Sequence, residues 1–334
     1  MKLFSTSKTW VRSVLLSAFA CSSAIAWAET TVRFQDYPGT GLLLVRVAQA
    51  QGFCEKAGLK CELKTIPAAP LGLQTMLAGD IDVAYGPTEV AASAAARKLP
   101  IKVIGAGFVD PVFFLVAGAK VQLPNEGKPY PAVVADFKGK KIGVTQRGSG
   151  AEIQVTDMLA QAGLTASDVT YVAVGAPNTA FPALTNGQVD LVMSFSPMDG
   201  LCDVLKACRI VVDPRIGEGS PKVLATRGGA GALMVKADWA EANLETVAAI
   251  RKMLALAEAY TQDPANFSNV LTILKATFGL TMPKADEIAE ATLKRGITTF
   301  HAQGKVPAMQ AVADYMFENK QLPSRPDMAS IVLP

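Results

Sequence analysis

Short apolar runs alternate with longer segments of helical periodicity along most of the chain. Short apolar runs bounded by turn residues are typical of buried strands, and longer patterns of helices. In the first part of the chain they predict strands at 31–35, 61–66, 82–85 and 101–105, and helices at 41–57, 71–78 and 88–98. This strand–helix–strand order predicts an α/β domain with a mainly parallel sheet.

The second part of the chain repeats this order, with predicted strands at 141–145, 169–174, 191–194 and 210–212. Between the two parts, the apolar run 113–117 predicts a crossing strand and the proline-rich segment 123–131 a surface loop. After a predicted return strand at 230–235, the pattern is helical to residue 321, with breaks at Pro264, Pro283 and Pro307. We expect these last helices to pack on the first part.

One sequence pattern occurs twice, about 108 residues apart. The first copy has the landmarks Gly39-Thr40-Gly41, Ala57-Gly58-Leu59, Ala69-Pro70 and Gly79-Asp80-Ile81-Asp82-Val83. The second has Gly148-Ser149-Gly150, Ala162-Gly163-Leu164, Ala176-Pro177 and Gly187-Gln188-Val189-Asp190-Leu191. The offsets of 109, 105, 107 and 108 residues are too long for a solenoid repeat and predict two similar lobes with a cleft between them.

The N-terminal segment has the pattern of an export signal. Lys2, Lys8 and Arg12 precede the apolar stretch 14–25, and Ala26-Trp27-Ala28 predicts cleavage before Glu29. The stretch is shorter than the span of about 20 residues that crosses a membrane. A lipid anchor on Cys21 is the alternative, which the bulky Phe19 two residues earlier disfavours. The pattern predicts a periplasmic protein.

The predicted organisation has four parts: a signal peptide at 1–28, the first lobe at 29–112, the second lobe at 113–235, and a helical part of the first lobe at 236–334. Removing the signal takes away three of the 32 basic residues and none of the 29 acidic ones. The mature chain is therefore neutral, which argues against a nucleic-acid-binding protein. Its 306 residues and the 50% apolar composition of the sequence suit two domains.

Four cysteines of the mature chain form two close pairs, Cys54 with Cys61 and Cys202 with Cys208. In an oxidising compartment such pairs favour disulfides. A zinc site is one alternative, but neither pair has the two-residue spacing of a zinc knuckle. The other alternative is that either pair stays unbridged as small apolar residues.

Ligands bind beyond the carboxyl ends of parallel strands, where loops enter helices. Four segments meet this description: 37–41, 86–89, 147–150 and 177–179. Backbone N–H groups and hydroxyls at such helix starts can clamp an anionic or polar group. Each segment also has a purely structural interpretation, because Ser149 with Glu152 matches a capping box and Thr88 and Asn178 match helix caps.

Candidate catalytic groups are few. His301 is the single histidine and lies far along the chain from the predicted cleft loops. The sequence contains no nucleophile elbow, phosphate-binding loop, histidine-based metal motif or dinucleotide fingerprint. Asp82 and Asp190 occupy the same place in the two copies at a strand entrance, which favours a turn or cap role over acid–base chemistry.

The order and spacing of several short motifs resemble the substrate-binding proteins of ABC transporters for nitrate, sulfonates, taurine and thiamine precursors. The motifs are Gly79-Asp80-Ile81-Asp82-Val83-Ala84 with Gly86-Pro87-Thr88, Lys138-Gly139-Lys140-Lys141-Ile142-Gly143-Val144, Gln161-Ala162-Gly163-Leu164, and Asn186-Gly187-Gln188-Val189-Asp190 with Pro197. The resemblance covers essentially the whole mature chain. It implies a two-lobed type II periplasmic binding fold that closes on one small solute and presents it to an inner-membrane permease, as a monomer without cofactor, metal or enzymatic activity.

The resemblance also implies a set of ligand-binding residues. Together with the loop residues above, the predicted set is Tyr37, Gly39, Thr40, Pro87, Thr88, Glu89, Arg147, Gly148, Ser149, Gly150, Asn178, Phe195 and Ser196. Arg147 favours a small organic anion, a sulfonate or carboxylate. Candidates for an apolar or aromatic slot are Tyr37, Tyr85, Phe108, Phe181 and Phe195. The alternative ligand within the family is a pyrimidine or other thiamine-related precursor.

One departure from the family pattern concerns the ligand. Many relatives have an aromatic residue, an acid and a proline where this chain has Phe195-Ser196-Pro197. The missing acid disfavours an amine-bearing ligand such as taurine. An enzyme of the same fold, akin to thiamine-pyrimidine synthases, is the remaining alternative, although the reactive histidine and cysteine-rich constellation of that class is absent from the sequence.

Overall fold

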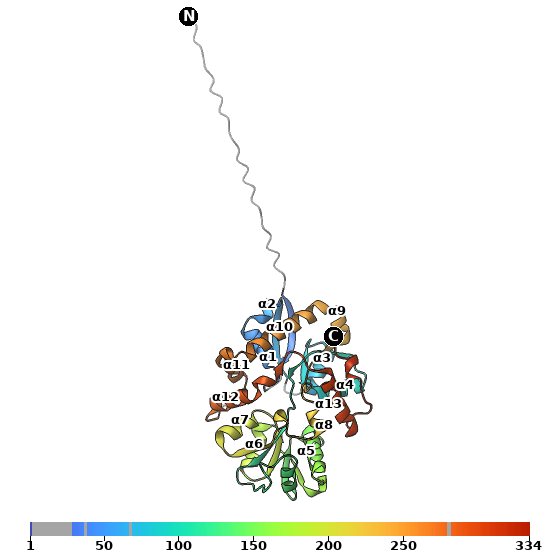
Figure 1. Cartoon of the computed structure of the whole chain (residues 1–334). Coiled ribbons are helices and arrows are strands. Elements are labelled where there is room, and N and C mark those ends of the chain that lie inside the picture. The colour runs from blue at the N-terminus through green and yellow to red at the C-terminus, as the bar shows by residue number, and fades with distance from the viewer. Residues whose placement is uncertain (2–28, 37–38, 67–68, 279–281) are drawn as a thin grey trace.

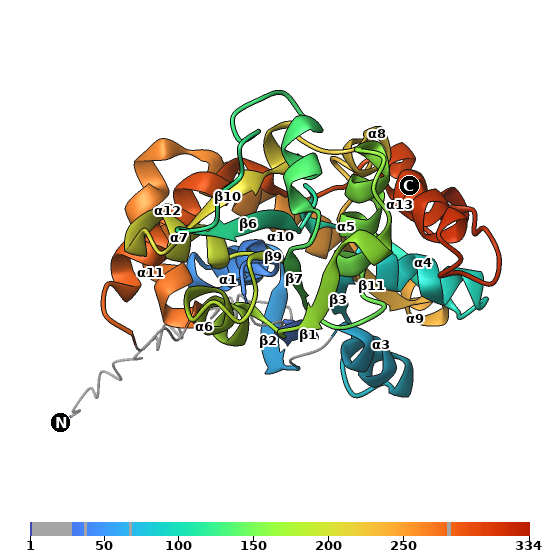
Figure 2. The ribbon, with the colours of Figure 1, turned by 90° about the horizontal axis from the view of Figure 1, so that it is seen from below.

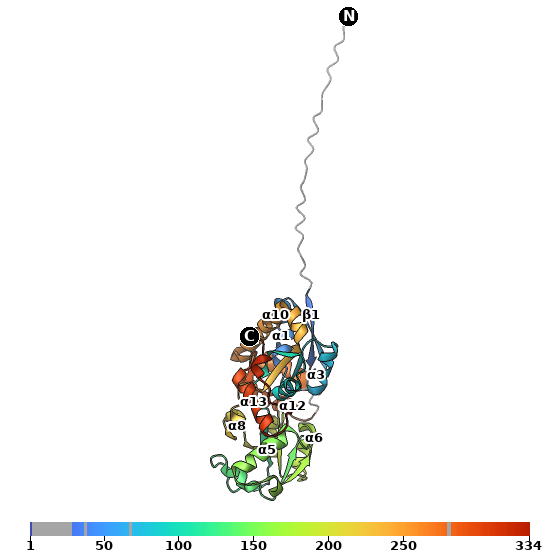
Figure 3. The same ribbon diagram turned by 90° about the vertical axis from the view of Figure 1, so that its right-hand side faces the viewer.

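The computed structural model describes Met1 and residues 29–36, 39–66, 69–278 and 282–334. It shows two α/β lobes stacked end to end, with α12 (Ala285–Gly296) and α13 (Val306–Glu318) at the level of their junction (Figures 1 and 3). Residues 2–28 of the predicted signal peptide and Tyr37 lie outside the described residues. No helix in the described part of the chain is both long and apolar enough to cross a membrane.

The first lobe begins with a parallel strand pair. Strand β1 (Thr30–Asp36) pairs with β2 (Leu59–Thr65). The single helix predicted between them is two helices, α1 (Leu43–Ala50) and α2 (Phe53–Lys56). Gly52 separates them because it adopts a left-handed conformation with φ of 68° that an α-helix cannot contain.

A second sheet of the first lobe contains the strand that returns from the other lobe. Strand β11 (Gly231–Lys236) runs antiparallel between β3 (Ala84–Pro87) and β4 (Ile101–Gly105), flanked by α3 (Ala69–Ala78) and α4 (Thr88–Ala96). The predicted boundary at residue 235 is therefore wrong, because residues 231–235 belong to a sheet of the first lobe. The two-residue strands β5 (Gly107–Phe108) and β12 (Phe300–His301) form a further pair that the helical pattern did not predict.

The second lobe is built on one five-stranded sheet of order β10-β6-β9-β7-β8. Its strands are β6 (Phe114–Gly118), β7 (Lys141–Val144), β8 (Thr170–Ala173), β9 (Leu191–Ser194) and β10 (Cys208–Val212), and its helices are α5 (Gly150–Gln161), α6 (Pro177–Thr185), α7 (Met198–Leu205) and α8 (Pro221–Leu224). Strands β7, β8 and β9 are parallel, as predicted, whereas β6 runs antiparallel to β9 and β10. Strand β6, the predicted crossing strand, therefore runs in the opposite direction to the other four strands of this sheet.

The C-terminal helices span both lobes. They are α9 (Ala237–Ala242), α10 (Leu244–Gln262), α11 (Phe267–Phe278), α12 and α13. Helix α10 packs on α1, as predicted, but α12 packs on α7 of the second lobe (Figure 2). Gly200 allows this contact, because a Cβ there would lie 2.5 Å from the carbonyl oxygen of Ile288. Pro307 does not break a helix but lies in the first turn of α13, where its missing N–H costs nothing.

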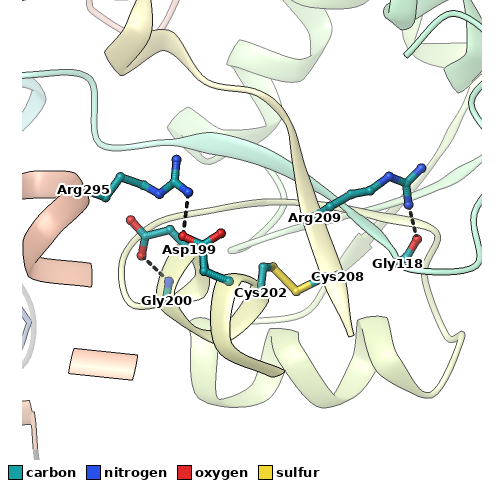
Figure 4. The surroundings of a disulfide bond; sticks show 8 residues. Gly118, Asp199, Gly200, Cys202, Cys208, Arg209 and Arg295 are labelled. Carbon is teal, nitrogen blue, oxygen red and sulfur yellow. Dashed lines mark hydrogen bonds and ion pairs between the residues drawn. A yellow bond between two sulfur atoms is a disulfide. The ribbon is translucent and has the colours of Figure 1, made fainter. Parts of the chain in front are cut away.

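Both predicted disulfides are present. Cys54 of α2 is bonded to Cys61 of β2 with a Cα–Cα distance of 6.0 Å, and Cys202 of α7 to Cys208 of β10 with 4.7 Å. Figure 4 shows Arg295 of α12 beside the second disulfide, where its guanidinium lies 2.6 Å from the Asp203 carboxylate. The Cys202–Cys208 bond links α7, the helix on which α12 packs, to β10.

Candidate functional site

A cavity of about 120 Å³ lies between the lobes. The first lobe contributes the loop from β1 to α1, the end of β3 and the residues after β5, and the second lobe contributes the residues before β6 and after β9. The lining residues are Gly39, Thr40, Gly41, Tyr85, Pro87, Phe108, Val112, Phe113, Phe195 and Ser196. The cavity therefore lies at carboxyl ends of strands of both lobes, where this class of sheet binds ligands.

Two phenylalanines form the wall on the second lobe. Phe113 and Phe195 meet edge to face, with ring centroids 6.2 Å apart and planes at 77°. The strand register brings them together, because Phe114 is paired with Ser194 in the antiparallel ladder, so the next residue outward on each strand lies at the same end. Such rings bind flat or apolar groups.

Close backbone approach shapes the wall on the first lobe. A Cβ on Gly41 would lie 2.3 Å from the Tyr85 ring, so this position has no room for a side chain. The neighbouring loop is held by Arg46 of α1, whose guanidinium donates to the Gly39 carbonyl at 2.7 Å and to the Asp36 carboxylate at 2.6 Å. The buried Arg46 thus fixes the entrance of α1 without facing the cavity as a free charge.

None of the described residues that line the cavity carries a charge. Their polar groups are the hydroxyls of Thr40, Tyr85 and Ser196 and the backbone of the glycine loop. Such a cavity offers hydrogen bonds and apolar contact to a solute, and its described wall contains no histidine, carboxylate, amine or thiol that could act as a base or nucleophile.

The loop from Arg147 to Ser149 closes on itself instead of facing the cavity. The Arg147 guanidinium makes two hydrogen bonds of 2.9 Å to the Glu152 carboxylate, which raises the pKa of Arg147. Gly148 donates its N–H to the same carboxylate at 2.7 Å, and Ser149 caps α5 by accepting from the Glu152 N–H at 3.5 Å. The capping interpretation of Ser149 and Glu152 is confirmed, although the Glu152 side chain binds Gly148 and not Ser149 as a full capping box requires.

Other predicted residues also have structural partners. Thr88 is not a cap but the first residue of α4, and its buried hydroxyl donates to the Gly229 carbonyl at 2.6 Å. Asn178 is exposed in the first turn of α6, whose N-cap is Ala176. Gly150 is close to the cavity wall, since a Cβ there would lie 3.5 Å from the Phe113 ring.

Glu89 lines a separate cavity of about 20 Å³ between the lobes. Gln154 of α5 and Tyr315 of α13 line it too, and the Gln154 Oε1 and Tyr315 hydroxyl are buried without a hydrogen-bond partner. Burial raises the pKa of the Glu89 carboxyl. This small cavity has room for about one water molecule.

The structure thus brings together only part of the predicted set. Gly39, Thr40, Pro87, Phe195 and Ser196 line the main cavity, while Thr88, Glu89, Arg147, Gly148, Ser149, Gly150 and Asn178 do not line it. Tyr85 and Phe108 of the predicted aromatic slot do line it. Val112 and Phe113 were missed, because the pattern around them indicated only a crossing strand.

A buried ionic network supports the cavity wall at Ser196. The Ser196 hydroxyl donates to the Asp199 Oδ2 at 2.9 Å, and the Arg215 guanidinium binds the same oxygen at 2.7 Å. Arg215 also binds both oxygens of Asp213 at 2.8 Å and lies 4.1 Å from the centre of the Phe114 ring. Burial lowers the pKa of Arg215, but the two carboxylates outweigh it and raise the pKa overall.

Comparison with solved structures identifies the fold. The chain is similar to the periplasmic aliphatic sulphonate binding protein SsuA from Escherichia coli, with a TM-score of 0.71 and 20% identity over 90% of this chain and 97% of that one. It is also similar to the alkanesulfonate-binding protein SsuA from Xanthomonas axonopodis pv. citri bound to MOPS, with a TM-score of 0.66 and 21% identity over 92% of this chain and 98% of that one. A third similar structure is the periplasmic nitrate-binding protein NrtA from Synechocystis PCC 6803, with a TM-score of 0.66 and 13% identity over 90% of this chain and 84% of that one. The chain has the two-lobed periplasmic binding protein fold, as the resemblance implied.

Sequence comparison finds a match to one family model in the central region. Residues 41–203 match the family model described as NMT1/THI5 like. A protein of Brucella abortus (strain 2308), named as a candidate binding protein, is 28% identical over 166 residues, which are 49% of this chain and 47% of that protein. A protein of Brucella suis biovar 1 (strain 1330) gives the same values. The chain matches about half the length of these curated relatives.

Proposed function

We propose that the chain is the exported solute receptor of an ABC importer, which closes its lobes on one small molecule in the periplasm and delivers it to an inner-membrane permease. The supporting observation is a cavity whose lining is divided between two lobes. A ligand that contacts both lobes favours the closed state by its differential affinity for it. No catalytic group lines the described wall, which suits capture without reaction.

The proposed solute is a small organic anion, a sulfonate or carboxylate, with an apolar or aromatic body. The start of α1 supplies the anion end, where Thr40 and Gly41 line the cavity and a helix N-terminus favours negative charge. The body lies against Phe113 and Phe195. Because no guanidinium or ammonium lines the described wall, a bare inorganic anion fits less well than a solute that also buries apolar surface.

A pyrimidine-like ring is the second candidate. The observation that favours it is the aromatic lining of an uncharged cavity, since a heterocycle gains as much from ring contacts as from charge. The family model is also described as NMT1/THI5 like. An enzyme of the same fold remains a third alternative that a turnover measurement separates from both.

Lobe closure is proposed to bend the two segments that connect the lobes. These segments lie side by side, because Gly228 and Ala230 donate their N–H groups to the Val109 carbonyl at 2.9 and 3.0 Å. Strands β6 and β11 are held in ladders of opposite lobes, so bending falls on residues 109–113 and 228–230 rather than inside the strands. We therefore propose that the hinge lies just outside strands β6 and β11 and not within them.

Isothermal titration of the purified mature chain tests the ligand class. Alkyl and aryl sulfonates, aromatic carboxylates, nitrate and simple pyrimidines form the panel. An organic anion that binds in the micromolar range or tighter supports the leading proposal, and binding of pyrimidines alone favours the second candidate. Small-angle scattering with the best binder should show a smaller radius of gyration, whereas an unchanged radius contradicts closure.

A further inference from the structure

Ser196 lines the cavity, and its hydroxyl is hydrogen bonded to a carboxylate behind the wall. Behind it lies Asp199, which is fully buried. The Asp199 Oδ1 accepts the Gly200 N–H at 2.9 Å, and Oδ2 accepts the Arg215 guanidinium at 2.7 Å. Each oxygen of this carboxylate is thus already bound by a group that can only donate.

The direction of the remaining hydrogen bond follows from this arrangement. A carboxylate paired with a guanidinium is ionised and has no proton to offer, so it only accepts. In the 2.9 Å contact between Ser196 Oγ and Asp199 Oδ2, the hydroxyl is therefore the donor. Arg215 cannot easily leave, because Asp213 binds it through two hydrogen bonds of 2.8 Å.

We infer that Ser196 acts toward the cavity only as a hydrogen-bond acceptor, and that the bound solute presents an N–H or O–H group to it. This inference rests on the proposed function and narrows its solute class. With its hydrogen committed to Asp199, the Ser196 oxygen offers lone pairs alone, and a solute oxygen without hydrogen is repelled there. Asp199 and Arg215 are positioning residues that act through Ser196.

The inference changes the expectation drawn from the Phe195-Ser196-Pro197 sequence. Position 196 lacks the acid of the family pattern, but the Asp199 carboxylate lies behind the Ser196 hydroxyl and accepts its hydrogen bond at 2.9 Å. The cavity wall at Ser196 therefore still favours a hydrogen-bond donor on the solute. The acceptor is a neutral hydroxyl oxygen, which binds a donor more weakly than a carboxylate does. A solute with an anionic end at the start of α1 and a donor at the opposite end matches both lobes.

The direction of the hydroxyl can be measured without a ligand. Neutron diffraction from crystals of the deuterated mature chain locates the deuterium on Ser196 Oγ. We expect it on the line to Asp199 Oδ2. A deuterium that points into the cavity, or one carried by Asp199 itself, overturns the inference.

A matched pair of probes tests the consequence. 4-Aminobenzenesulfonate and 4-methylbenzenesulfonate differ only in an amino group that donates and a methyl group that does not. We expect the amino probe to bind about three- to tenfold more tightly, as one net hydrogen bond provides. The preference should vanish in Ser196→Ala, survive in Ser196→Thr, and survive in Ser268→Ala, a change of an exposed serine on α11.

The outcomes separate the inference from the proposed function. Equal affinities in the unmodified chain, or a preference that persists in Ser196→Ala, contradict the acceptor role of Ser196. If neither probe binds at millimolar concentration, the proposed aryl-anion class fails. The neutron result then still decides the direction of the hydroxyl.

Discussion

The Asp82 carboxylate lies 2.8 Å from the backbone nitrogen of Arg33 and accepts its hydrogen bond. Asp190 makes the same 2.8 Å bond to the backbone nitrogen of Lys141, and each pair is separated by 49 residues in the chain. The repeated aspartate thus ties the strand that follows it to β1 in the first lobe and to β7 in the second lobe. Both aspartates therefore make a bond between strands and not the turn or cap that their position predicted, and neither lines the main cavity.

Removing these aspartates should lower stability unequally. Asp190→Ala loses a backbone hydrogen bond and should cost about 1 kcal/mol of unfolding free energy. Asp82→Ala should cost more, about 2 kcal/mol, because Asp82 also binds the Arg33 guanidinium at 2.9 and 2.6 Å. Urea denaturation measures both changes. Arg33→Ala is the control, and in its background the two aspartate substitutions should cost about the same; a persistent difference contradicts the account.

Loss of either disulfide should destabilise the chain, but only one loss should weaken solute binding. Each bridge closes a short loop and contributes about 2 to 3 kcal/mol in the loop-entropy model. The Cys202–Cys208 bridge also fixes α7, which begins two residues after Ser196. Cys202→Ala with Cys208→Ala should therefore reduce affinity in titration, while Cys54→Ala with Cys61→Ala should leave it unchanged. Equal effects on affinity would refute the proposed link between α7 and the cavity.

The buried carboxyl of Glu89 should make stability depend on pH. Burial raises its pKa in the folded chain, so the folded state holds the proton to higher pH than the unfolded state does. The contribution of protonated Glu89 to the free energy of unfolding is fully present below the ordinary glutamate pKa of about 4.3. It is lost as pH rises through the raised pKa. Gln154 and Tyr315 face the same cavity, and burial also raises the pKa of Tyr315. No lysine or arginine is among the described residues that line it.

Glu89→Gln should remove this component of the pH profile and stabilise the chain at neutral pH. Unfolding measured between about pH 4 and 8 checks the expected slope. Glu241→Gln, at an exposed position on α9, is the control and should leave the profile unchanged. A Glu89→Gln profile parallel to that of the unmodified chain shows that Glu89 titrates normally.

The cavity walls should control affinity, and the Arg147 loop should not. Phe113→Ala and Phe195→Ala each remove a ring from the wall and should weaken binding about tenfold or more, which corresponds to about 1.4 kcal/mol. Arg147→Ala should change affinity by less than about twofold at any ionic strength, because Arg147 is paired with Glu152 outside the cavity. Titration calorimetry at low and high salt measures all three. A large, salt-dependent loss in Arg147→Ala would instead place the anion at that loop.

The predicted elements that proved right depend on local signals. The strands at 101–105 and 191–194 have the bounds predicted from apolar runs between turn residues. The duplicated landmarks indicated two lobes, and close cysteine spacing indicated the two bridges. Each signal is contained within a few neighbouring residues or in their repetition along the chain.

The features that the sequence could not predict depend on distant pairing. Phe113 and Phe195 meet only because β6 runs antiparallel to β9 in one particular register. Arg147 looked like an anion-binding group, but Glu152, five residues away, binds it. Gly200 gave no sign that α12 would pack on α7, because its small size matters only beside Ile288 and Thr292.

Native mass spectrometry tests most directly whether the chain is a receptor that holds one unaltered solute between its lobes. The chain should be purified from its native host without refolding, beside a Phe113→Ala, Phe195→Ala double variant prepared in the same way. We expect one small molecule per chain, with the same mass after prolonged incubation, and its absence from the double variant. A chain that carries no solute, a variant that keeps it, or a solute whose mass changes with time would contradict the account, and the last result would favour the enzyme.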